Sequence, residues 1–175
     1  VMTAQRRFDE GSFAAKGMIE SVTALRTEGV ADRAVYDAVL RNVLAENPEL
    51  IGTWTGWEPN ALDGNDAPFV NTAGTDASGR FISYWNRGGG EIKLEALTDY
   101  DKPGPGDYYQ LPKSLKRPVA IEPYNYTVAG KNVLMMSFGI PIMVNGTYMG
   151  TGGADMALAD LGTAIGAIRP FETGH

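Results

Sequence analysis

Cysteine and histidine are almost missing from this chain of 175 residues: there is no cysteine, and the single histidine, His175, is the last residue. The lack of cysteine excludes disulfides, thiolate zinc sites and a cysteine nucleophile. One histidine leaves almost no room for a multi-histidine metal site or a histidine-based catalytic triad. No apolar run approaches the roughly 18 residues of a membrane-spanning helix, so no segment is predicted to cross a membrane.

Positive charge is also scarce. The chain has 15 Lys and Arg against 21 Asp and Glu, which gives a net charge of −6. Nucleic-acid binding needs clustered basic side chains, so no nucleic-acid partner is predicted. The acidic balance mildly favours a cationic ligand. With 43% hydrophobic residues, the chain is long enough for one domain with a substantial core.

The stretch from Thr3 to about Glu28 has no proline and carries apolar residues at heptad spacing. The gaps alternate between seven, three and four residues, through Phe8, Ala15, Met18, Val22 and Leu25, with Gly11 in the remaining position. This pattern predicts a helix with a narrow apolar seam, ending near Gly29. Two interpretations of the seam stay open. It packs on the helix's own domain, or it also pairs with a second copy and forms a weak homodimer.

A second helix is predicted between the capping residue Asp32 and Pro48. Its apolar side carries Val35, Val39 and Val43. Five strands are then predicted, over residues 50–58, 80–86, 118–128, 133–144 and 147–156. The last two connections are short enough for hairpins, so the final three strands should be antiparallel neighbours. A short closing helix is expected over residues 156–168. This element order is typical of an α+β fold.

Two long polar connections, residues 59–79 and 87–117, separate the predicted strands. Loops of this length over a compact sheet commonly cover a ligand. The first contains "LDGNDAP", which resembles part of a calcium loop but lacks its roughly 12-residue acidic pattern, so these acids are predicted to cap turns. "GTGGAD" (150–155) lacks the strand–turn–helix unit of a phosphate loop. No metal or cofactor is therefore predicted.

Aromatic and acidic residues crowd together at three places between residues 84 and 126. In "IEPYNY" (121–126), alternate residues of an extended chain share a face, so Glu122, Tyr124 and Tyr126 should point the same way. Tyrosine rings beside carboxylates form a cage that attracts cations and amines. The alternative is that each ring is an ordinary half-buried residue of the sheet.

The other two places are "YWNR" (84–87) and "DYDKPGPGDYYQLP" (99–112). Tyr84 and Trp85 are neighbours on a predicted strand, so only one of them can face a given side. Asp107 is predicted to cap a short helical turn that carries Tyr108 and Tyr109.

Several motifs in this order carry a resemblance to a known family: "WEPNALDGND", "DASGRFISYWNR", "GDYYQLPK", "EPYNY" and "MGTGGADMALADL". The chain resembles the extracytoplasmic Cache (PAS-like) sensor domain of bacterial methyl-accepting chemotaxis proteins, from its first helix to its end. The resemblance implies a long N-terminal helix packed on a central antiparallel sheet of about five strands. It also implies a non-enzymatic ligand sensor on the periplasmic side of a membrane-anchored receptor, without a cofactor.

The resemblance further implies a division of the chain. Residues 1–48 would form the N-terminal helical stalk and second helix, and residues 49–165 the membrane-distal ligand-binding module. Residues 166–175, "IRPFETGH" at their end, would begin the linker to a second module.

The family's amino-acid binders carry an aromatic pair, a later tyrosine and an aspartate, which correspond to Tyr108 with Tyr109, Tyr124 and Asp155. The position of the arginine that grips an α-carboxylate holds Gly106 here. This difference favours an amine, a polyamine or a quaternary ammonium compound over an amino acid. The family's first tyrosine corresponds loosely to Tyr100. The full set of predicted ligand-binding residues is Tyr84, Trp85, Tyr100, Asp107, Tyr108, Tyr109, Glu122, Tyr124, Tyr126 and Asp155.

Alternatives of three kinds remain at this level. The same sensor module can belong to a histidine kinase or a cyclic-dinucleotide enzyme, or can detect amino acids or organic acids. A carbohydrate-active enzyme would use a pair of carboxylates on an aromatic platform, but no spacing marks out such a pair. The third alternative is a dimerisation or scaffold module that binds no small molecule.

Overall fold

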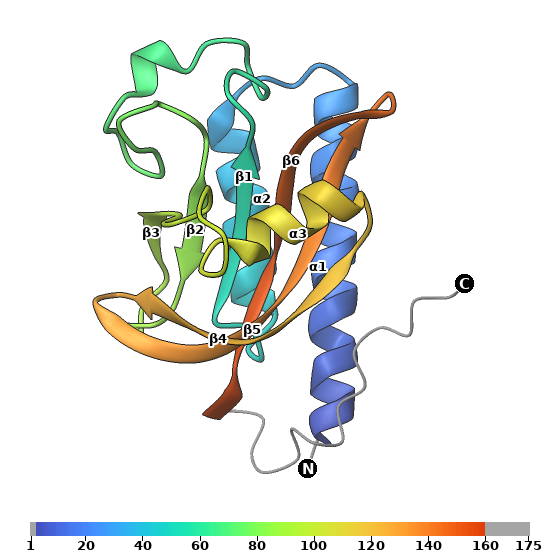
Figure 1. Cartoon of the computed structure of the whole chain (residues 1–175), viewed down its shortest axis with the longest axis vertical. Helices are drawn as coiled ribbons and strands as arrows, with labels where there is room; N and C mark the ends of the chain where they lie inside the picture. Colours follow the sequence, from blue (N-terminus) through green and yellow to red (C-terminus); the bar gives the residue numbers. More distant parts are fainter. Residues whose placement is uncertain (1–2, 160–175) are drawn as a thin grey trace.

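The protein is described by a computed structural model, which covers residues 3–159. Two helices, α1 (Ala4–Thr27) and α2 (Arg33–Glu46), precede a six-stranded antiparallel sheet (Figure 1). Its strands lie in the order β3-β2-β1-β6-β5-β4. They are β1 (Gly52–Trp57), β2 (Ser83–Asn86), β3 (Lys93–Ala96), β4 (Val119–Val128), β5 (Lys131–Val144) and β6 (Thr147–Ala157). The predicted α+β fold is confirmed.

Two differences from the predicted elements concern the long connection and the end of the chain. The connection over residues 87–117 contains the additional strand β3 and the helix α3 (Asp107–Leu115). The expected closing helix is wrong at its first residues, because Met156 and Ala157 belong to β6. The rest of that helix and the predicted linker over 166–175 lie outside the described residues. A short 3-10 helix, η1 (Ala67–Phe69), lies in the connection before β2.

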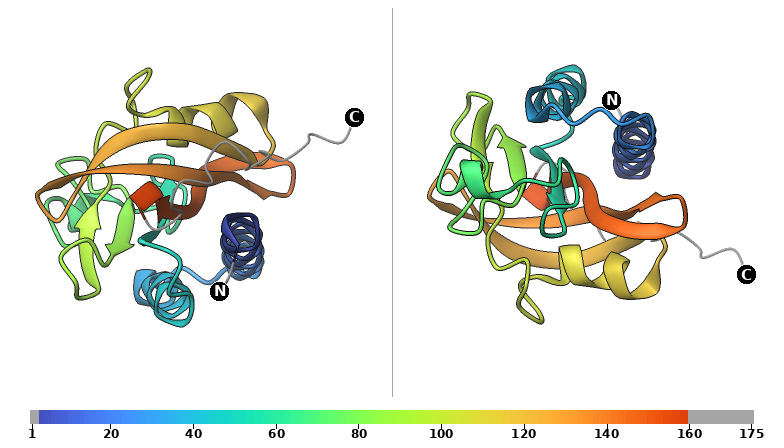
Figure 2. Two further views of the ribbon diagram at one scale, coloured as in Figure 1. Left: turned by 90° about the horizontal axis from the view of Figure 1, so that it is seen from below. Right: turned by 90° about the horizontal axis from the view of Figure 1, so that it is seen from above.

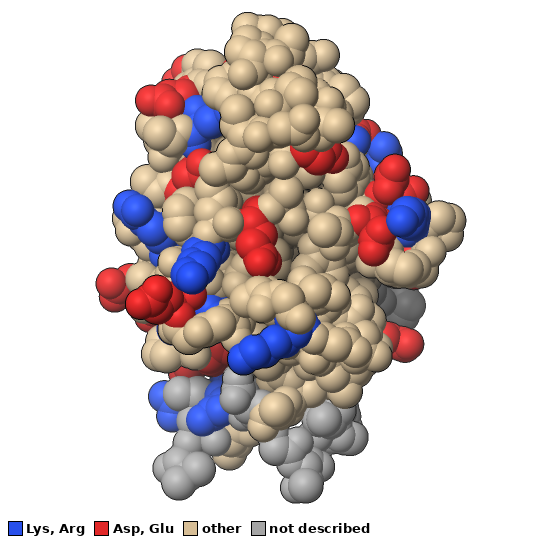
Figure 3. All heavy atoms as spheres, turned by 90° about the vertical axis from the view of Figure 1, so that its left-hand side faces the viewer, with Lys and Arg blue, Asp and Glu red and all other residues tan. Residues whose placement is uncertain are grey.

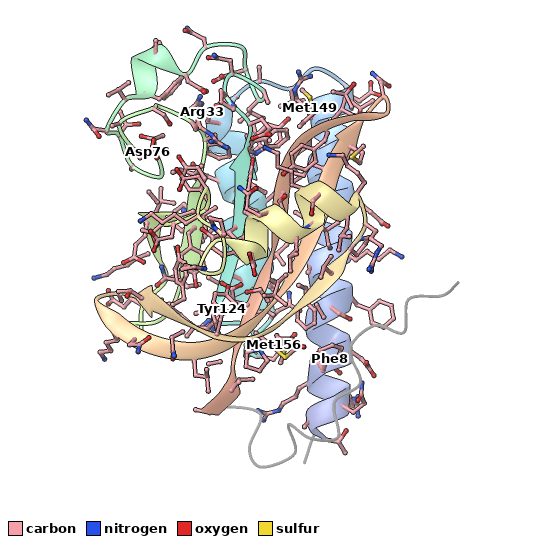
Figure 4. All side chains as sticks on the ribbon, viewed as in Figure 1. Phe8, Arg33, Asp76, Tyr124, Met149 and Met156 are labelled. Carbon is pink, nitrogen blue, oxygen red and sulfur yellow. The ribbon has the colours of Figure 1, made fainter. Side chains whose placement is uncertain are left out.

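The elements form three layers, with α1 and α2 on one face of the sheet and α3 on the other (Figure 2). The heptad seam of α1 is buried against its own sheet, which confirms the first interpretation of the seam. Phe8 and Met156 lie together at the base of α1 (Figure 4). A Cβ on Gly11 would lie 2.8 Å from the sulfur of Met156, so this glycine lets α1 approach β6 closely. Ala15, Met18 and Val22 are at most 2% exposed.

Side-chain caps define where both long helices begin. The Thr3 hydroxyl accepts a hydrogen bond from the backbone N–H of Arg6 at 3.2 Å, and the Asp32 carboxylate accepts one from Ala34 at 3.0 Å. Gly29, with φ +82°, follows the end of α1, as expected for a residue in the left-handed region. No helix within residues 3–159 combines the length and the hydropathy that crossing a membrane requires.

A buried ion-pair cluster joins α2 to the connection over residues 59–79. The guanidinium of Arg33 binds Asp63 at 2.7 and 3.2 Å and Asp66 at 2.8 Å, and it donates to the carbonyl of Gly79 at 2.9 Å. It also lies 3.8 Å from the centroid of the Phe69 ring. Arg33 therefore supplies the positive charge that these two carboxylates require. The described residues hold no group of three or more His, Cys, Asp or Glu side chains fit to bind a metal.

Candidate functional site

The face of the sheet beneath α3 is lined with aromatic rings. Trp54 of β1, Tyr84 of β2, Tyr108 of α3 and Tyr126 of β4 are all at most 8% exposed. Their ring centroids lie 5.1 Å apart for Trp54 and Tyr108, and 5.6 Å apart for Tyr84 and Tyr126, in edge-to-face contacts. Tyr124 of β4 stacks on Tyr108 at 6.3 Å. These five residues are called the aromatic face.

Two glycines make this arrangement sterically possible. A Cβ on Gly52 of β1 would lie 2.3 Å from the ring of Tyr84, so the lack of a side chain at Gly52 makes room for that ring. A Cβ on Gly139 of β5 would lie 2.8 Å from the carbonyl oxygen of Tyr108. The backbone of α3 therefore rests directly on the sheet and holds Tyr108 against Trp54.

Asp155 of β6 lies at the centre of the aromatic face and is 3% exposed. The Trp54 indole donates to its Oδ1 at 3.0 Å, and the Ser137 hydroxyl donates to the same oxygen at 2.6 Å. Strand register explains the contacts, because Asp155 pairs with Gly52 on one side and with Ser137 on the other. No Lys or Arg among residues 3–159 forms an ion pair with Asp155.

Burial raises the pKa of Asp155 to about 6, against the opposing effect of the nearby donor groups of Ser137, Tyr84 and Trp54. The Tyr84 hydroxyl lies beside the carboxylate but makes no hydrogen bond of standard geometry. Burial, and then the charge of Asp155, raise the pKa of Tyr84 well above its ordinary value. The site therefore contains a buried acid, a buried phenol without a well-formed hydrogen bond, and no compensating cation among residues 3–159.

Surface carboxylates have a different environment. On the side of the molecule that Figure 3 displays, acidic and basic side chains are interspersed. Glu58, for example, forms ion pairs with Arg80 and Lys113. Burial opposes the effect, but hydrogen bonds from Lys113 and Tyr109 keep the pKa of Glu58 below its ordinary value. Asp155 differs from such groups because it is buried and no Lys or Arg among residues 3–159 pairs with it.

A hydrogen-bond chain leads from Asp155 towards the outside. The Tyr124 hydroxyl lies 2.6 Å from the Ser137 hydroxyl, which in turn donates to Asp155. Tyr124 is only half-buried, on the edge strand β4, where Figure 4 labels it. Tyr124 is thus the member of the aromatic face through which solvent or a ligand can first reach the site.

Five of the ten predicted site residues come together in this arrangement: Tyr84, Tyr108, Tyr124, Tyr126 and Asp155. The expectation that Glu122 shares their face is wrong, because Glu122 is exposed. A β-bulge lies between Ile121 and Tyr124, so that Glu122 and Pro123 together oppose one residue of β5. Proline has no N–H for the ladder and occurs at such irregularities of edge strands.

Trp85 lies on the opposite face of the sheet, so it cannot join a cage with Tyr124. Its indole donates to the carboxylate of Asp37 of α2 at 3.0 Å, and the guanidinium of Arg41 lies 5.6 Å from its ring centroid. Of the two neighbours on β2, Tyr84 is the residue that faces Asp155. This agrees with the expectation that only one of them can face a given side.

Tyr100 and Tyr109 belong to a charged cluster beside the aromatic face. Tyr109 donates to Glu58 at 2.7 Å and accepts from Arg80 at 3.0 Å. Tyr100 donates to Asp76 at 2.6 Å, and the guanidinium of Arg80 lies 4.6 Å from its ring centroid. The rings of the two tyrosines are in contact at 5.9 Å. The Tyr109 hydroxyl is thus already hydrogen-bonded to Glu58 and Arg80, and the Tyr100 hydroxyl to Asp76.

Asp107 does not cap α3 as predicted. The capping position is Gly106, and Asp107 is the first helical residue. Its carboxylate accepts a hydrogen bond from the backbone N–H of Gly104 at 2.9 Å, which closes the turn before the helix. A Cβ on Gly106 would lie 2.2 Å from the carbonyl oxygen of Asp99, so an arginine there would require the turn to open.

The sequence-based prediction missed Trp54 and Ser137, the two donors to Asp155. Trp54 lies on a predicted strand, between Gly52 and Gly56 at alternate positions, which could have indicated a ring over a bare strand. No sequence pattern around Ser137 indicates that it donates to Asp155. Both contacts depend on strand register between residues that are far apart in the chain.

Two open grooves lie elsewhere among the described residues. One of 610 Å³ runs between α1 and β5, and its lining includes Ile19, Ala24 and Met143. Another of 670 Å³ lies between α1 and the end of α2. Neither is lined by a residue of the aromatic face. The aromatic face is the candidate site because it holds Asp155, a buried carboxylate, and not because it contains a large cavity.

Residues 36–163 match the sequence profile described as "Methyl-accepting chemotaxis protein-like, first PDC sensor domain". The chain belongs to this family. The resemblance to chemoreceptor sensor domains that the motifs indicated is therefore confirmed. A long N-terminal helix followed by an antiparallel sheet matches the PAS-like fold of similar sensor structures.

Similar proteins fall into two groups of PDC sensors. The chain is 30% identical over 178 residues to the methyl-accepting chemotaxis protein TlpQ of Pseudomonas aeruginosa, across 90% of this chain and 25% of TlpQ. It is 36% identical to the extracellular domain of the putative histidine kinase mmHK1S-Z3, with a TM-score of 0.80, across 96% of this chain and 58% of that one. A structure named Methyl-accepting Chemotaxis protein X is 28% identical, with a TM-score of 0.79, across 94% and 61% of the two chains. The chain thus spans a quarter of TlpQ.

Proposed function

We propose that this PDC domain is the periplasmic ligand-binding sensor of a membrane-anchored chemoreceptor, and that its ligand is a small cationic amine. The single observation that carries the ligand class is Asp155, a buried carboxylate among tyrosine rings with no ion-pair partner in residues 3–159. A buried carboxylate is stable only when it is paired, hydrogen-bonded or protonated. A ligand ammonium group would supply the missing charge.

The expected interactions are strong enough for a useful sensor. A cation gains about 0.5–2 kcal/mol from each well-placed aromatic ring once water is excluded. A charge-assisted hydrogen bond to Asp155 adds about 1.5–3 kcal/mol. After the ligand's loss of freedom is subtracted, these contributions support an affinity in the micromolar range.

The polar groups of the site favour an amine that carries N–H groups. Both well-formed hydrogen bonds to Asp155 end on Oδ1, and the nearby Tyr84 hydroxyl has none. A primary or secondary ammonium can donate to Oδ2 and to the Tyr84 oxygen together. A quaternary ammonium would gain only the cation–π and through-space contributions. The proposal therefore ranks primary and secondary amines and polyamines above betaines.

An amino-acid ligand is less well supported, because its α-carboxylate lacks a partner. The position of the family arginine holds Gly106. Arg80 lies near the site, but its guanidinium already donates to the carbonyl of Trp57 at 2.9 Å, to Glu58 at 3.2 Å and to Tyr109 at 3.0 Å. A ligand carboxylate would have to break this cluster.

A thermal-shift screen tests the ligand class directly. The purified domain would be screened against amines, polyamines, betaines, amino acids and organic acids, since a ligand that binds only the folded state raises the melting temperature. The proposal predicts that primary or secondary amines give the largest shifts. Shifts from organic acids alone would contradict the cationic ligand class and leave the sensor family unaffected.

Replacing Tyr124 by Ala should weaken amine binding about tenfold. The change removes a ring from the aromatic face and the hydroxyl that bonds Ser137, and each loss is worth about 1 kcal/mol. Calorimetric titration measures the effect. Trp85→Phe is the matched control, because Trp85 lies on the face of the sheet that α1 and α2 cover, and binding should stay within about twofold of wild type. Equal losses in both variants would indicate general damage to the sheet.

Occupancy of the site would be transmitted through the sheet to the rest of the receptor. We propose residues 49–165 as the ligand-binding module and 166–175 as the start of a linker to a second module. The output can also be a histidine kinase, a second candidate favoured by the 36% identity to mmHK1S-Z3. Ligand binding by the sensor is the same in both cases.

We also propose that the domain forms a weak homodimer through the outward side of α1. The seam residue Met18 is buried in the core, so Met18→Glu is expected to unfold the domain. Phe13, by contrast, is 72% exposed. Phe13→Ser should abolish concentration-dependent association in sedimentation velocity and change unfolding free energy by less than about 0.5 kcal/mol. Unchanged association of Phe13→Ser would contradict a dimer through this side of α1.

A further inference from the structure

We propose that in acidic surroundings Asp155 holds a proton when the site is empty and that a cationic ligand displaces it, so that acidity and ligand compete for one carboxylate. The inference rests on the proposed amine-binding function and adds its regulation. One cation enters the site, one proton leaves, and the net charge of the buried site is unchanged. The sensor would therefore respond more weakly to the same amine in acidic surroundings.

The surroundings of Asp155 supply no charge that could stabilise its ionised form. Every element packed around it contributes a neutral group: Trp54 from β1, Tyr84 from β2, Tyr108 from α3, Tyr124 and Tyr126 from β4, and Ser137 from β5. Burial raises the pKa of each of the four tyrosines, so these phenols stay protonated across the physiological range. No Lys, Arg, Asp or Glu is among these neighbours. An empty site is thus stabilised by a proton on Asp155.

The hydrogen-bond pattern identifies the oxygen that would carry this proton. Oδ1 already accepts from Trp54 at 3.0 Å and from Ser137 at 2.6 Å. The proton therefore belongs on Oδ2. The Tyr84 hydroxyl lies beside the carboxyl group, is buried and lacks a well-formed hydrogen bond, so it offers an acceptor for this proton. Protonation of Asp155 would thus also satisfy the Tyr84 hydroxyl, and an ammonium N–H would replace the proton at the same place.

A chain of hydroxyls links the carboxylate of Asp155 to the edge of the site on β4. Ser137 joins Asp155 to Tyr124 through two contacts of 2.6 Å, and Tyr124 is half-buried at the edge of the site. The pKa of about 6 that burial gives Asp155 supports an exchange within the range where bacterial surroundings vary. The expected sign is that amine affinity falls as pH decreases below about 6, because protons then compete for the carboxylate.

The ligand-free half of the proposal is tested by difference infrared spectroscopy of the wild-type domain against Asp155→Asn. The wild type should show a protonated-carboxyl band at pH 5 that disappears by pH 7 and is absent from the variant. Asp37→Asn is the matched control, because Asp37 also accepts from a tryptophan indole at 3.0 Å but belongs to α2, on the opposite face of the sheet. An Asp155 that is ionised at both pH values would overturn the proposal.

The exchange itself is tested by calorimetry with n-butylamine and 1,4-diaminobutane in buffers of different ionisation enthalpy. At pH 5 we expect release of close to one proton per bound amine, and an affinity about tenfold lower than at pH 7. Amine binding with equal affinity at both pH values and no proton release would overturn the exchange and leave the proposed function intact. Failure of every amine to bind, with an Asp155 that still titrates, would overturn the function and the exchange together.

Discussion

Replacing Asp155 by Asn should weaken amine binding at least tenfold while the domain stays folded. The amide keeps the shape of the carboxylate and can still accept from Trp54 and Ser137, but it removes the charge that would pair with an ammonium group. Loss of one charge-assisted hydrogen bond corresponds to about 1.5–3 kcal/mol, which is a factor of ten or more in affinity. Calorimetry gives the affinity, and circular dichroism gives the fold.

The control for this change is Asp37→Asn. Both aspartates accept a tryptophan indole N–H at 3.0 Å, and burial raises the pKa of both. Only Asp155 lies among the tyrosines, so Asp37→Asn should leave amine affinity within about twofold of wild type. An Asp155→Asn variant that binds amines as tightly as wild type would exclude Asp155 as the counter-charge.

Replacing Arg33 by Met should lower the free energy of unfolding by about 3–5 kcal/mol, since it leaves Asp63 and Asp66 without their cation. Arg33 is 7% exposed and Asp66 is 6% exposed, so water cannot easily replace the guanidinium. The connection over residues 59–79 would lose its attachment to α2. Urea unfolding of the purified variant measures the effect.

Arg41→Met provides the comparison. Arg41 is exposed and lies 5.6 Å from the ring of Trp85, so its loss should change stability by less than about 1 kcal/mol. A loss of similar size in the two variants would show that the Arg33 cluster has no special role in the fold. A loss below about 1 kcal/mol for Arg33→Met would contradict a stabilising role of the buried ion pairs with Asp63 and Asp66.

Features that depend on neighbouring residues could be predicted from the sequence. The Asp32 cap, the seam of α1 and the final two hairpins follow from local spacing and turn chemistry, and all three are present. The resemblance to a sensor family then indicated Asp155 and the tyrosines at 108 and 124. Those residues meet on one face because strand order brings β6 between β1 and β5.

Features that depend on register or on long-range contacts could not be predicted. The bulge at Pro123 turns Glu122 outward, and a strict two-residue alternation cannot anticipate it. The donors Trp54 and Ser137 lie 101 and 18 residues from Asp155. Arg33 and Asp63 form an ion pair although they are 30 residues apart, so the sequence around Asp63 does not indicate that Arg33 is its partner.

Calorimetric titration of the wild-type domain at pH 7 tests the central claim most directly. A cation-binding site formed by Asp155 and its tyrosines predicts that n-butylamine or 1,4-diaminobutane binds with micromolar affinity. It also predicts that butyrate at the same concentration gives no binding heat. Tight binding of butyrate, with no response to any amine or betaine, would contradict the cationic ligand and leave only the PDC sensor fold.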